Sequence, residues 1–403
     1  MPRTERHQVT YLAKTDFRNQ RTRFGIKERD RLLHLYAIGQ TGTGKSTLLE
    51  TLIRQDLAAG RGLALLDPHG DLVERLAAQV PPARRETCIY MDAPDPHQPY
   101  GYNPLKQVAP EKRPLAAAGM LEVFKKMWED AWGPRMEHIL RNALLALLDY
   151  PDATLLDLPR LLDEREFRRR VGRTTTNPQV AEFLLREYER YTPRMRSEAI
   201  APIQNKVGAF LADPTLRRIL CAPEKPIGVR RLMDEGGVVL LVNLSKGRLG
   251  EDAAHLLGGL LVTTIGLAAF SRAEVPERER RPFFLYLDEF QHFTTLALVT
   301  MASELRKYGV GMVLVHQYLD QLAPEIRHAV LGNVGTVISF RVGPHDAPFL
   351  AREFAPTFST EDLVNLPNHH IYLRLMIDGT PSRPFSARTL HPGELEAGGT
   401  LGQ

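Results

Sequence analysis

The 403-residue sequence has little cysteine. Its two cysteines, Cys88 and Cys221, stand alone rather than in spaced pairs, so a disulfide scaffold and a cysteine zinc site are excluded. That usage suits a reducing cytosol. The first 31 residues lack the apolar segment that a signal peptide requires. With 43% hydrophobic and 25% charged residues, the composition predicts a folded soluble chain rather than a fibrous, disordered or polytopic membrane protein.

Long hydrophobic runs are also scarce. The uncharged stretch at residues 253–270 spans 18 positions, which is near the lower limit of about 17 residues for a membrane span. It contains His255, a Gly-Gly pair and two threonines, and it lies between two strand-like segments. We therefore expect a buried helix here and no transmembrane segment in the chain.

The charge balance is a weak indicator of a partner. Lys and Arg number 52 against 48 Asp and Glu, a net charge of +4. Residues 1–31 carry nine of these basic residues against four acidic ones, which predicts a basic N-terminal arm. The sequence leaves open whether this arm docks on DNA or on a membrane protein.

Apolar runs alternate with helical patterns along most of the chain. Because the runs are continuously hydrophobic, they predict buried parallel strands covered on both faces, hence an α/β doubly wound fold. The predicted strands are 32–38, 62–66, 88–91, 238–244, 283–287, 311–315 and 335–342. Helical patterns follow most of them, notably at 45–59, 250–270, 292–307 and 345–354.

The strand signal stops between residues 92 and 237, where the sequence predicts an all-helical insertion. We therefore divide the chain into five parts. These are a basic arm (1–31), the first part of a nucleotide-binding domain (32–104), an all-helical domain (105–235), the second part of the nucleotide-binding domain (236–390) and a polar tail (391–403).

The segment GQTGTGKS at 39–46 matches the phosphate-loop pattern GxxxxGK[ST], and it lies between a predicted strand and a predicted helix. Its glycines let backbone N–H groups turn toward phosphate oxygens at a helix N-terminus. Lys45 is positioned to reach the β- and γ-phosphates, and Ser46 to offer a hydroxyl to Mg²⁺. The candidate nucleotide-binding residues are Gly39, Gln40, Thr41, Gly42, Thr43, Gly44, Lys45, Ser46 and Thr47.

A second motif, FFLYLDEF at 283–290, ends a hydrophobic strand with two carboxylates. Asp288 is the candidate for the Mg²⁺ shell, and Glu289 for orienting and deprotonating the attacking water. A guanine reader of the Asn-Lys-x-Asp type is absent, because Asn205-Lys206 is followed by Val-Gly. The two motifs together predict hydrolysis of ATP with Mg²⁺.

Several longer motifs are more discriminating. LLDPHGDL (65–72), YNPL (102–105), WGPRMEHILRNALLALL (132–148), LDEFQHF (287–293) and ELRKYGVGMVLVHQYLDQL (304–322) occur in one order. The series resembles the TraG/TraD-like DNA-transfer coupling proteins of type IV secretion and conjugation, within the FtsK–HerA superfamily of DNA-pumping ATPases. The likeness covers about residues 22–390 and implies a RecA-like P-loop core.

The resemblance implies further site residues. Gln317 takes the place of the sensor that reads the γ-phosphate or the lytic water. Arg306 and Arg341 are the two candidates for an arginine that completes the site of a neighbouring subunit. Asp67 lies near the nucleotide in the family, although an ordinary helix-capping role for Asp67 or Asp71 fits the sequence equally well.

The implied function is an ATP-driven ring, expected to be hexameric, that moves single- or double-stranded DNA and works with a relaxase or a secretion channel. The basic run at 165–173 is either a DNA-backbone contact or a solvated helix face. Coupling proteins usually begin with transmembrane helices, whereas a short basic arm precedes Lys45 here. We therefore expect a cytoplasmic chain, or one held at the inner membrane by a partner.

Three alternatives stay open at this point. One is a soluble motor of the HerA type that works beside a nuclease in DNA repair or defence. Another is a secretion ATPase that acts on protein subunits. The third is a non-enzymatic scaffold locked by nucleotide, against which the intact Lys45 and Asp288-Glu289 argue.

Overall fold

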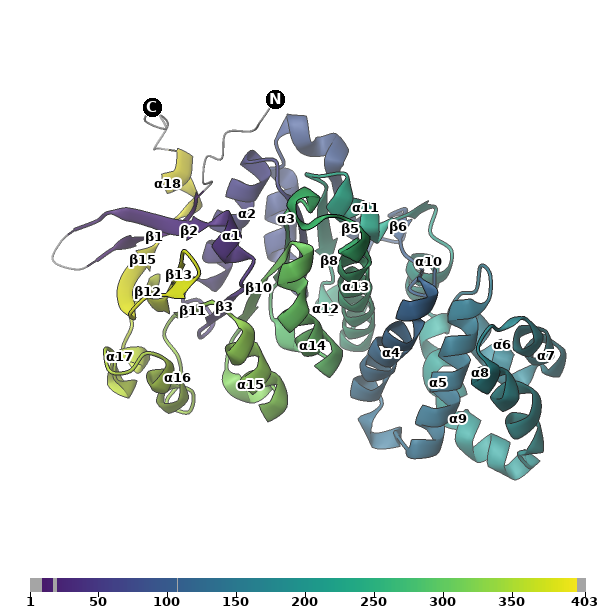
Figure 1. The fold of residues 1–403 in the computed structure, drawn as a ribbon. Coiled ribbons are helices and arrows are strands. Elements are labelled where there is room, and N and C mark those ends of the chain that lie inside the picture. The colour runs from purple at the N-terminus through teal and green to yellow at the C-terminus, as the bar shows by residue number, and fades with distance from the viewer. Residues whose placement is uncertain (1–8, 17–19, 107, 397–403) are drawn as a thin grey trace.

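The structure is a computed structural model that describes residues 9–16, 20–106 and 108–396 (Figure 1). Within these residues, eleven strands form one sheet in the order β2-β1-β15-β12-β11-β3-β10-β9-β4-β8-β5. In that order the strands are Arg23–Lys27, Val9–Thr15, Phe385–Thr389, His370–Arg374, Thr336–Ser339, Leu35–Ile38, Val310–His316, Phe283–Leu287, Gly62–Asp67, Val239–Asn243 and Cys88–Asp92.

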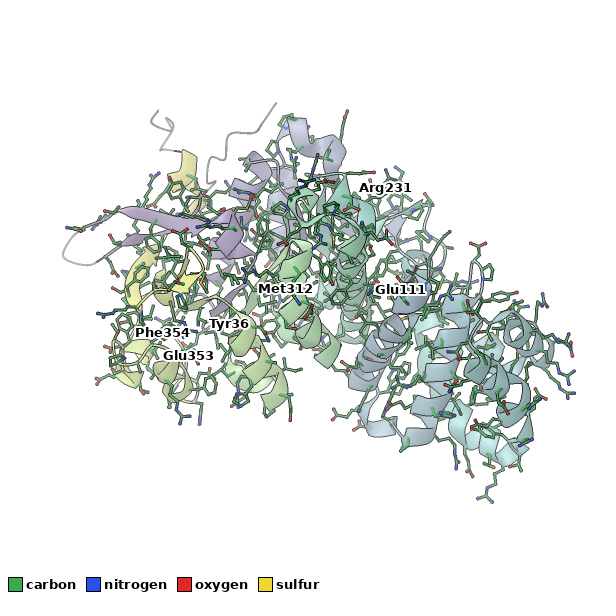
Figure 2. The ribbon with its side chains drawn as sticks, viewed as in Figure 1. Tyr36, Glu111, Arg231, Met312, Glu353 and Phe354 are labelled. Atoms are coloured by element: carbon green, nitrogen blue, oxygen red, sulfur yellow. The ribbon has the colours of Figure 1, made fainter. Side chains whose placement is uncertain are left out.

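All neighbours from β11 to β5 are parallel, and helices cover both faces of this part of the sheet (Figure 1). Alternate residues along each strand enter two separate hydrophobic cores. Tyr36 and Met312 belong to one core and lie in the interior, whereas Arg231 lies on the outside (Figure 2). The prediction of a doubly wound, mostly parallel sheet is thereby confirmed.

The core facing α2 and α3 is built from the other set of strand residues, including Leu65 and Tyr286. The helices of the nucleotide-binding part are α1 (Glu28–Arg31), α2 (Lys45–Ala58), α3 (Asp71–Ala78), α12 (Lys246–Leu249), α13 (Glu251–Ser271), α14 (Leu296–Leu305), α15 (Pro324–Asn333), α16 (Ala347–Glu353), α17 (Thr360–Val364) and α18 (Pro392–Glu396).

The N-terminal segment differs from the predicted arm. Residues 9–15 and 23–27 pair with each other in antiparallel fashion, and β1 also pairs with β15. They therefore extend the main sheet instead of preceding it. In β1 buried and exposed positions alternate only in part, and this mixed pattern with basic residues hid the strand. Residues 1–8 and 17–19 of the arm, and residues 397–403 of the tail, lie outside the described residues.

A group of helices lies beside the sheet, at the right of Figure 1. Its helices are α4 (Arg113–Met127), α5 (Pro134–Asp149), α6 (Asp157–Asp163), α7 (Arg165–Thr174), α8 (Pro178–Glu182), α9 (Pro193–Ala212) and α10 (Pro214–Cys221). Helix α11 (Val229–Asp234) lies next to the sheet instead, where it packs against α13 and β4. Helix α4 packs closely on α13 at Gly119. A Cβ atom at this position would lie only 2.6 Å from the side chain of Thr263, so the approach requires glycine. The close approach seats the helical part on the core.

Helix α13 contains the uncharged run discussed above. Among the described residues, one helix is long and apolar enough to cross a membrane, Glu251–Glu274, and 78% of its apolar window is buried inside the structure. It packs against α4, α11 and α14. As the sequence predicts, this segment is a buried helix of the fold.

A buried ionic cluster ties the N-terminal strands to the central sheet. Arg31 forms a bidentate pair with Asp56, at 2.6 and 2.8 Å, and Arg61 adds a third contact at 3.0 Å. Tyr286 of β9 donates to the same carboxylate at 2.5 Å. Burial alone would raise the pKa of Asp56, but the two guanidinium groups outweigh it and hold that pKa below its usual value. The carboxylate therefore stays ionised.

We expect Asp56→Ala to lower the free energy of unfolding by about 3–5 kcal/mol, because it leaves two guanidinium groups buried without their counter-charge. Chemical denaturation of the variant measures this loss. Glu361→Ala, an exposed change on α17, serves as the control and should stay within about 0.5 kcal/mol of the parent. A loss below about 1 kcal/mol for Asp56→Ala would contradict the assigned role.

Candidate functional site

The parallel register brings the ends of four strands to one edge of the sheet. His316 is aligned with Ile38, and Leu287 with both Leu314 and Leu66. The residues that follow these strands are consequently neighbours in space. In doubly wound folds ligands bind at this carboxyl edge, and the motifs predicted from the sequence lie here.

The loop at 39–46 connects β3 to α2. Gly42 and Gly44 have φ angles of 76° and 121°, a conformation that residues with a Cβ rarely adopt. A Cβ atom at Gly39 would lie 2.5 Å from Phe340. The loop therefore needs glycine at these positions, and it delivers the N-terminus of a 14-residue helix. Such a helix end, with free N–H groups, is suited to bind phosphate.

Lys45 is the first residue of α2 and is only 7% exposed. Its ammonium donates to the carbonyl oxygens of Gly39, at 2.6 Å, and of Gln40, at 3.1 Å. Burial lowers the pKa of Lys45, while the charges of Glu289 and Asp288 oppose that shift. The lysine thus lies between its own loop and the two carboxylates at the end of β9.

Asp288 is almost fully buried. Burial, together with the charges of Asp67 and Glu289, raises its pKa to about 7, although Lys45 acts in the opposite direction. Three carboxylates around one lysine leave excess negative charge, which a divalent cation would neutralise. The donor set thus fits Mg²⁺, with Asp288 and the exposed hydroxyl of Ser46 as the groups that would hold it.

Glu289 follows Asp288 in a left-handed conformation, with φ of 46°, which is uncommon outside glycine and asparagine. Both its carboxylate oxygens accept hydrogen bonds from amide side chains. Gln317 donates to Oε1 at 2.9 Å, and Gln291 donates to Oε2 at 2.7 Å. The structure thus brings together Glu289 and Gln317, as expected, and adds Gln291.

Gln291 was missed in the sequence analysis. The available signal was its place in the LDEFQHF motif, two residues after Glu289. The same short segment, η9 (Phe290–His292), also meets the helical part of the chain. Lys126 of α4 donates to the carbonyl oxygens of Gln291, at 2.5 Å, and of Thr294, at 3.2 Å. Residues from the sheet and the helical part therefore converge on the loop that carries Glu289.

Asp67 at the end of β4 caps the helix that follows. It accepts hydrogen bonds from the backbone N–H groups of His69, Leu72 and Val73 at 2.9 to 3.0 Å. The capping role is confirmed for Asp67, and its charge also acts on the pKa of Asp288. The position of Asp67 near a bound nucleotide stays a prediction.

The two candidate arginines lie in different places. Arg341 is beside its own phosphate loop, where its Nε donates to Gln40 Oε1 at 3.4 Å and its Nη1 to the carbonyl of Leu366 at 3.1 Å. Arg306 is exposed at the opposite end of β10, in η10 (Arg306–Tyr308). The seven residues of β10 place it roughly 20 Å from the loop of its own chain.

Two arginines of the basic run at 165–173 form ion pairs within the helical part of the chain. Arg168 is 1% exposed and pairs with Glu189 at 2.8 Å, and Arg165 pairs with the same glutamate at 2.9 Å. These arginines hold α7 to the neighbouring helices. Arg170 and Arg173 of the run are exposed, and a DNA-backbone contact through them stays a prediction.

A polar cleft of about 460 Å³ opens next to the phosphate loop. Its lining comes from the loop, the end of β10 and the segment after β11, so it borders both Gln317 and the glycine-rich turn. The lining residues are Gln40, Thr41, Gln317, Tyr318, Asp320, Gly343, His345 and Asp346. Its size suits a small polar ligand.

Comparisons with known proteins agree with this arrangement. The conjugative coupling protein TrwB in complex with the GTP analogue GDPNP matches with a TM-score of 0.68 and 17% identity, over 91% of this chain and 87% of that chain. TrwB with the ATP analogue ADPNP matches at 0.66 and 18%, over 90% and 86%. VirB4 of Thermoanaerobacter pseudethanolicus matches at 0.64 and 14%, over 96% and 98%.

These structural matches confirm the RecA-like P-loop fold. None of the curated proteins compared with the chain matches it. The family model described as the type IV secretion-system coupling protein DNA-binding domain matches residues 24–368. Since that match spans most of the chain, the protein belongs to the family of type IV secretion-system coupling protein DNA-binding domains.

Proposed function

We propose that the protein is an ATP-hydrolysing motor that moves DNA in type IV secretion or conjugation. The observation that carries the proposal is Glu289, a buried carboxylate held by two amides and placed beside the lysine of an intact phosphate loop. Membership of the coupling-protein family supports DNA as the partner. Of the similar structures, TrwB has been solved with ADPNP and with ADP and Mg²⁺.

In this proposal each side chain has a definite role. Lys45 exchanges its two loop carbonyls for phosphate oxygens of ATP. Glu289 accepts a proton from the attacking water, and Gln317 and Gln291 hold its carboxylate in place. Mg²⁺, bound through Ser46 and Asp288, supplies positive charge against the phosphates. The remaining loop residues, from Gly39 to Thr47, surround the phosphates with backbone N–H groups.

We further propose that copies of the chain form a ring, expected to be hexameric, in which Arg306 of one subunit completes the site of the next. The placement of Arg306 far from its own loop supports this role, whereas Arg341 belongs to its own subunit's site. The ring's partner at the inner membrane would be a relaxase or a secretion channel.

The motor predicts ATP hydrolysis that DNA stimulates. We expect turnover to rise with single- or double-stranded DNA, and the stimulation to fall steeply with salt, because phosphate contacts release counterions. Phosphate release measured with and without DNA checks this, with Glu289→Gln as an inactive control that still binds ATP. Hydrolysis indifferent to DNA in an assembled ring would favour a secretion ATPase acting on protein, and binding without turnover would favour a scaffold.

The two glutamines should affect turnover rather than affinity. We expect Gln291→Ala and Gln317→Ala each to lower kcat on the order of 10²-fold, since a displaced catalytic carboxylate loses that much, with the KM for ATP unchanged. Steady-state kinetics measure both constants. Gln179→Ala, an exposed change on α8, is the matched control. Unchanged kcat in Gln291→Ala would exclude its positioning role.

The arginine roles can be separated by mixing variants. Arg306→Ala alone should lower kcat by at least about 10³-fold. Rings mixed from Arg306→Ala and Lys45→Ala subunits should regain activity, because some interfaces then combine an intact loop with an intact arginine. Mixtures of Arg341→Ala with Lys45→Ala should stay inactive if Arg341→Ala alone is impaired. Recovery only in the Arg341→Ala mixtures would reverse the assignment.

A further inference from the structure

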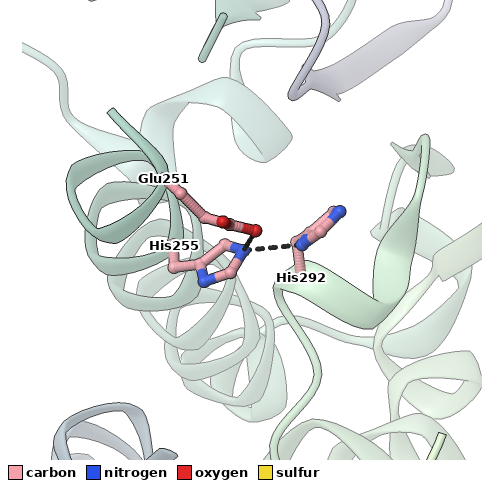
Figure 3. A group of neighbouring side chains, drawn as sticks. All are labelled: Glu251, His255 and His292. Atoms are coloured by element: carbon pink, nitrogen blue, oxygen red, sulfur yellow. Dashed lines mark hydrogen bonds and ion pairs between the residues drawn. The ribbon is translucent and has the colours of Figure 1, made fainter. Parts of the chain in front are cut away.

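Three metal-ligating side chains meet outside the nucleotide site (Figure 3). Glu251 and His255 lie one turn apart at the start of α13, and His292 ends η9. His255 Nε2 lies 2.6 Å from His292 Nδ1 and 3.8 Å from Glu251 Oε1. Each residue contributes one potential ligand atom, and these three atoms lie within 4.8 Å of one another. The two ring centroids are 4.6 Å apart and the ring planes are inclined by 26°, so the rings meet edge to edge through these two nitrogens.

The hydrogen bonds around these rings define their protonation. Lys246 Nζ lies 2.9 Å from His292 Nε2. An ammonium group only donates, so Nε2 accepts and the ring proton of neutral His292 is on Nδ1. That proton is donated to His255 Nε2. A single proton therefore joins the two nitrogens that face each other, and burial, followed by the charge of Lys246, lowers the pKa of His292 to about 3.

We propose that Glu251, His255 and His292 form a binding site for a divalent transition-metal cation of the zinc type. Two neutral imidazoles and a carboxylate are the ligands that Zn²⁺ and Co²⁺ accept, with a further position left to water. Mg²⁺ prefers oxygen ligands, so the site is chemically distinct from the one at the phosphate loop. The cation replaces the single proton between the rings.

The geometry needs only a small adjustment. Tetrahedral coordination with metal–nitrogen bonds of about 2.0–2.1 Å separates two ring nitrogens by about 3.3 Å. The present 2.6 Å therefore widens by roughly 0.7 Å. Glu251 is largely exposed, with 65% of its side chain accessible, and is free to approach the cation. The site is thus within reach of side-chain motion alone.

Lys246 opposes the cation in two ways. Its charge repels a second positive group, and it cannot accept the N–H that His292 carries on Nε2 once Nδ1 binds metal. Lys126, and His69 when protonated, add positive charge nearby, while Glu251 and Asp252 add negative charge. An acceptor in place of the ammonium strengthens metal sites. Lys246→Gln should therefore tighten binding, which a structural histidine pair would not do.

An ion here would join η9 to α13. His292 follows Glu289 by three residues, and Gln291 between them holds the Glu289 carboxylate. A bound cation would therefore restrain the segment that positions Glu289; this consequence rests on the proposed ATPase function. Metal binding itself does not, so the two can fail separately.

The test is a titration of the full chain with Co²⁺, without nucleotide or Mg²⁺, followed by visible absorption and then by displacement with Zn²⁺. We expect one Co²⁺ per chain at this site. His255→Ala and His292→Ala should lower the affinity at least tenfold, Glu251→Gln should also lower it, and Lys246→Gln should raise it about tenfold. His97→Ala, on an exposed loop, is the matched control and should bind as the parent does.

The proposal would be overturned if the parent protein bound no Co²⁺ at about 100 μM. Equal binding by the parent and both histidine variants would also overturn it. Circular dichroism shows whether those variants fold. If the histidine variants do not fold, the Glu251→Gln and Lys246→Gln variants test the site instead. An unchanged Co²⁺ affinity in both would mean that the cation binds elsewhere and would overturn the proposal.

Discussion

The hydrogen-bonded register of the central parallel strands determines where every charged group of the site lies. Because β3, β10, β9 and β4 end within two residues of one another, the phosphate loop and the catalytic candidates meet without any long connection. A slip of one residue in β9 would turn the adjacent carboxylates to opposite faces. The two hydrophobic cores, one on each face of the sheet, oppose such a slip and so maintain the site.

Within that frame, η9 and the residue before it form the most heavily constrained segment. Glu289 has a left-handed backbone conformation, and its side chain has no freedom while both oxygens are held. The next residues contact Lys126 of the helical part and His255 of α13. Parts of the chain that lie far apart in sequence thus share one short loop. This arrangement gives the helical part a direct physical connection to the Glu289 carboxylate.

Much of this architecture could be predicted from the sequence because buried parallel strands are long apolar runs. All the runs we identified form strands, and the phosphate loop and Asp288-Glu289 follow them as expected. The antiparallel strands β1 and β2 were not predicted, since one face of each strand is partly solvated and basic residues interrupt the hydrophobic pattern. The contacts of Lys126 and the pairing of His255 with His292 could not be foreseen, because they depend on how α4, α13 and η9 pack together.

The position of Lys45 has a consequence for ligand selection. Its ammonium is already satisfied by Gly39 and Gln40, so an incoming ligand competes with two internal acceptors. A neutral or singly charged molecule offers little advantage over those carbonyls, whereas a polyphosphate offers several charged oxygens. The loop's own carbonyl groups therefore disfavour the binding of weakly charged molecules. Because of these hydrogen bonds, Lys45 is not an exposed cation available to every anion.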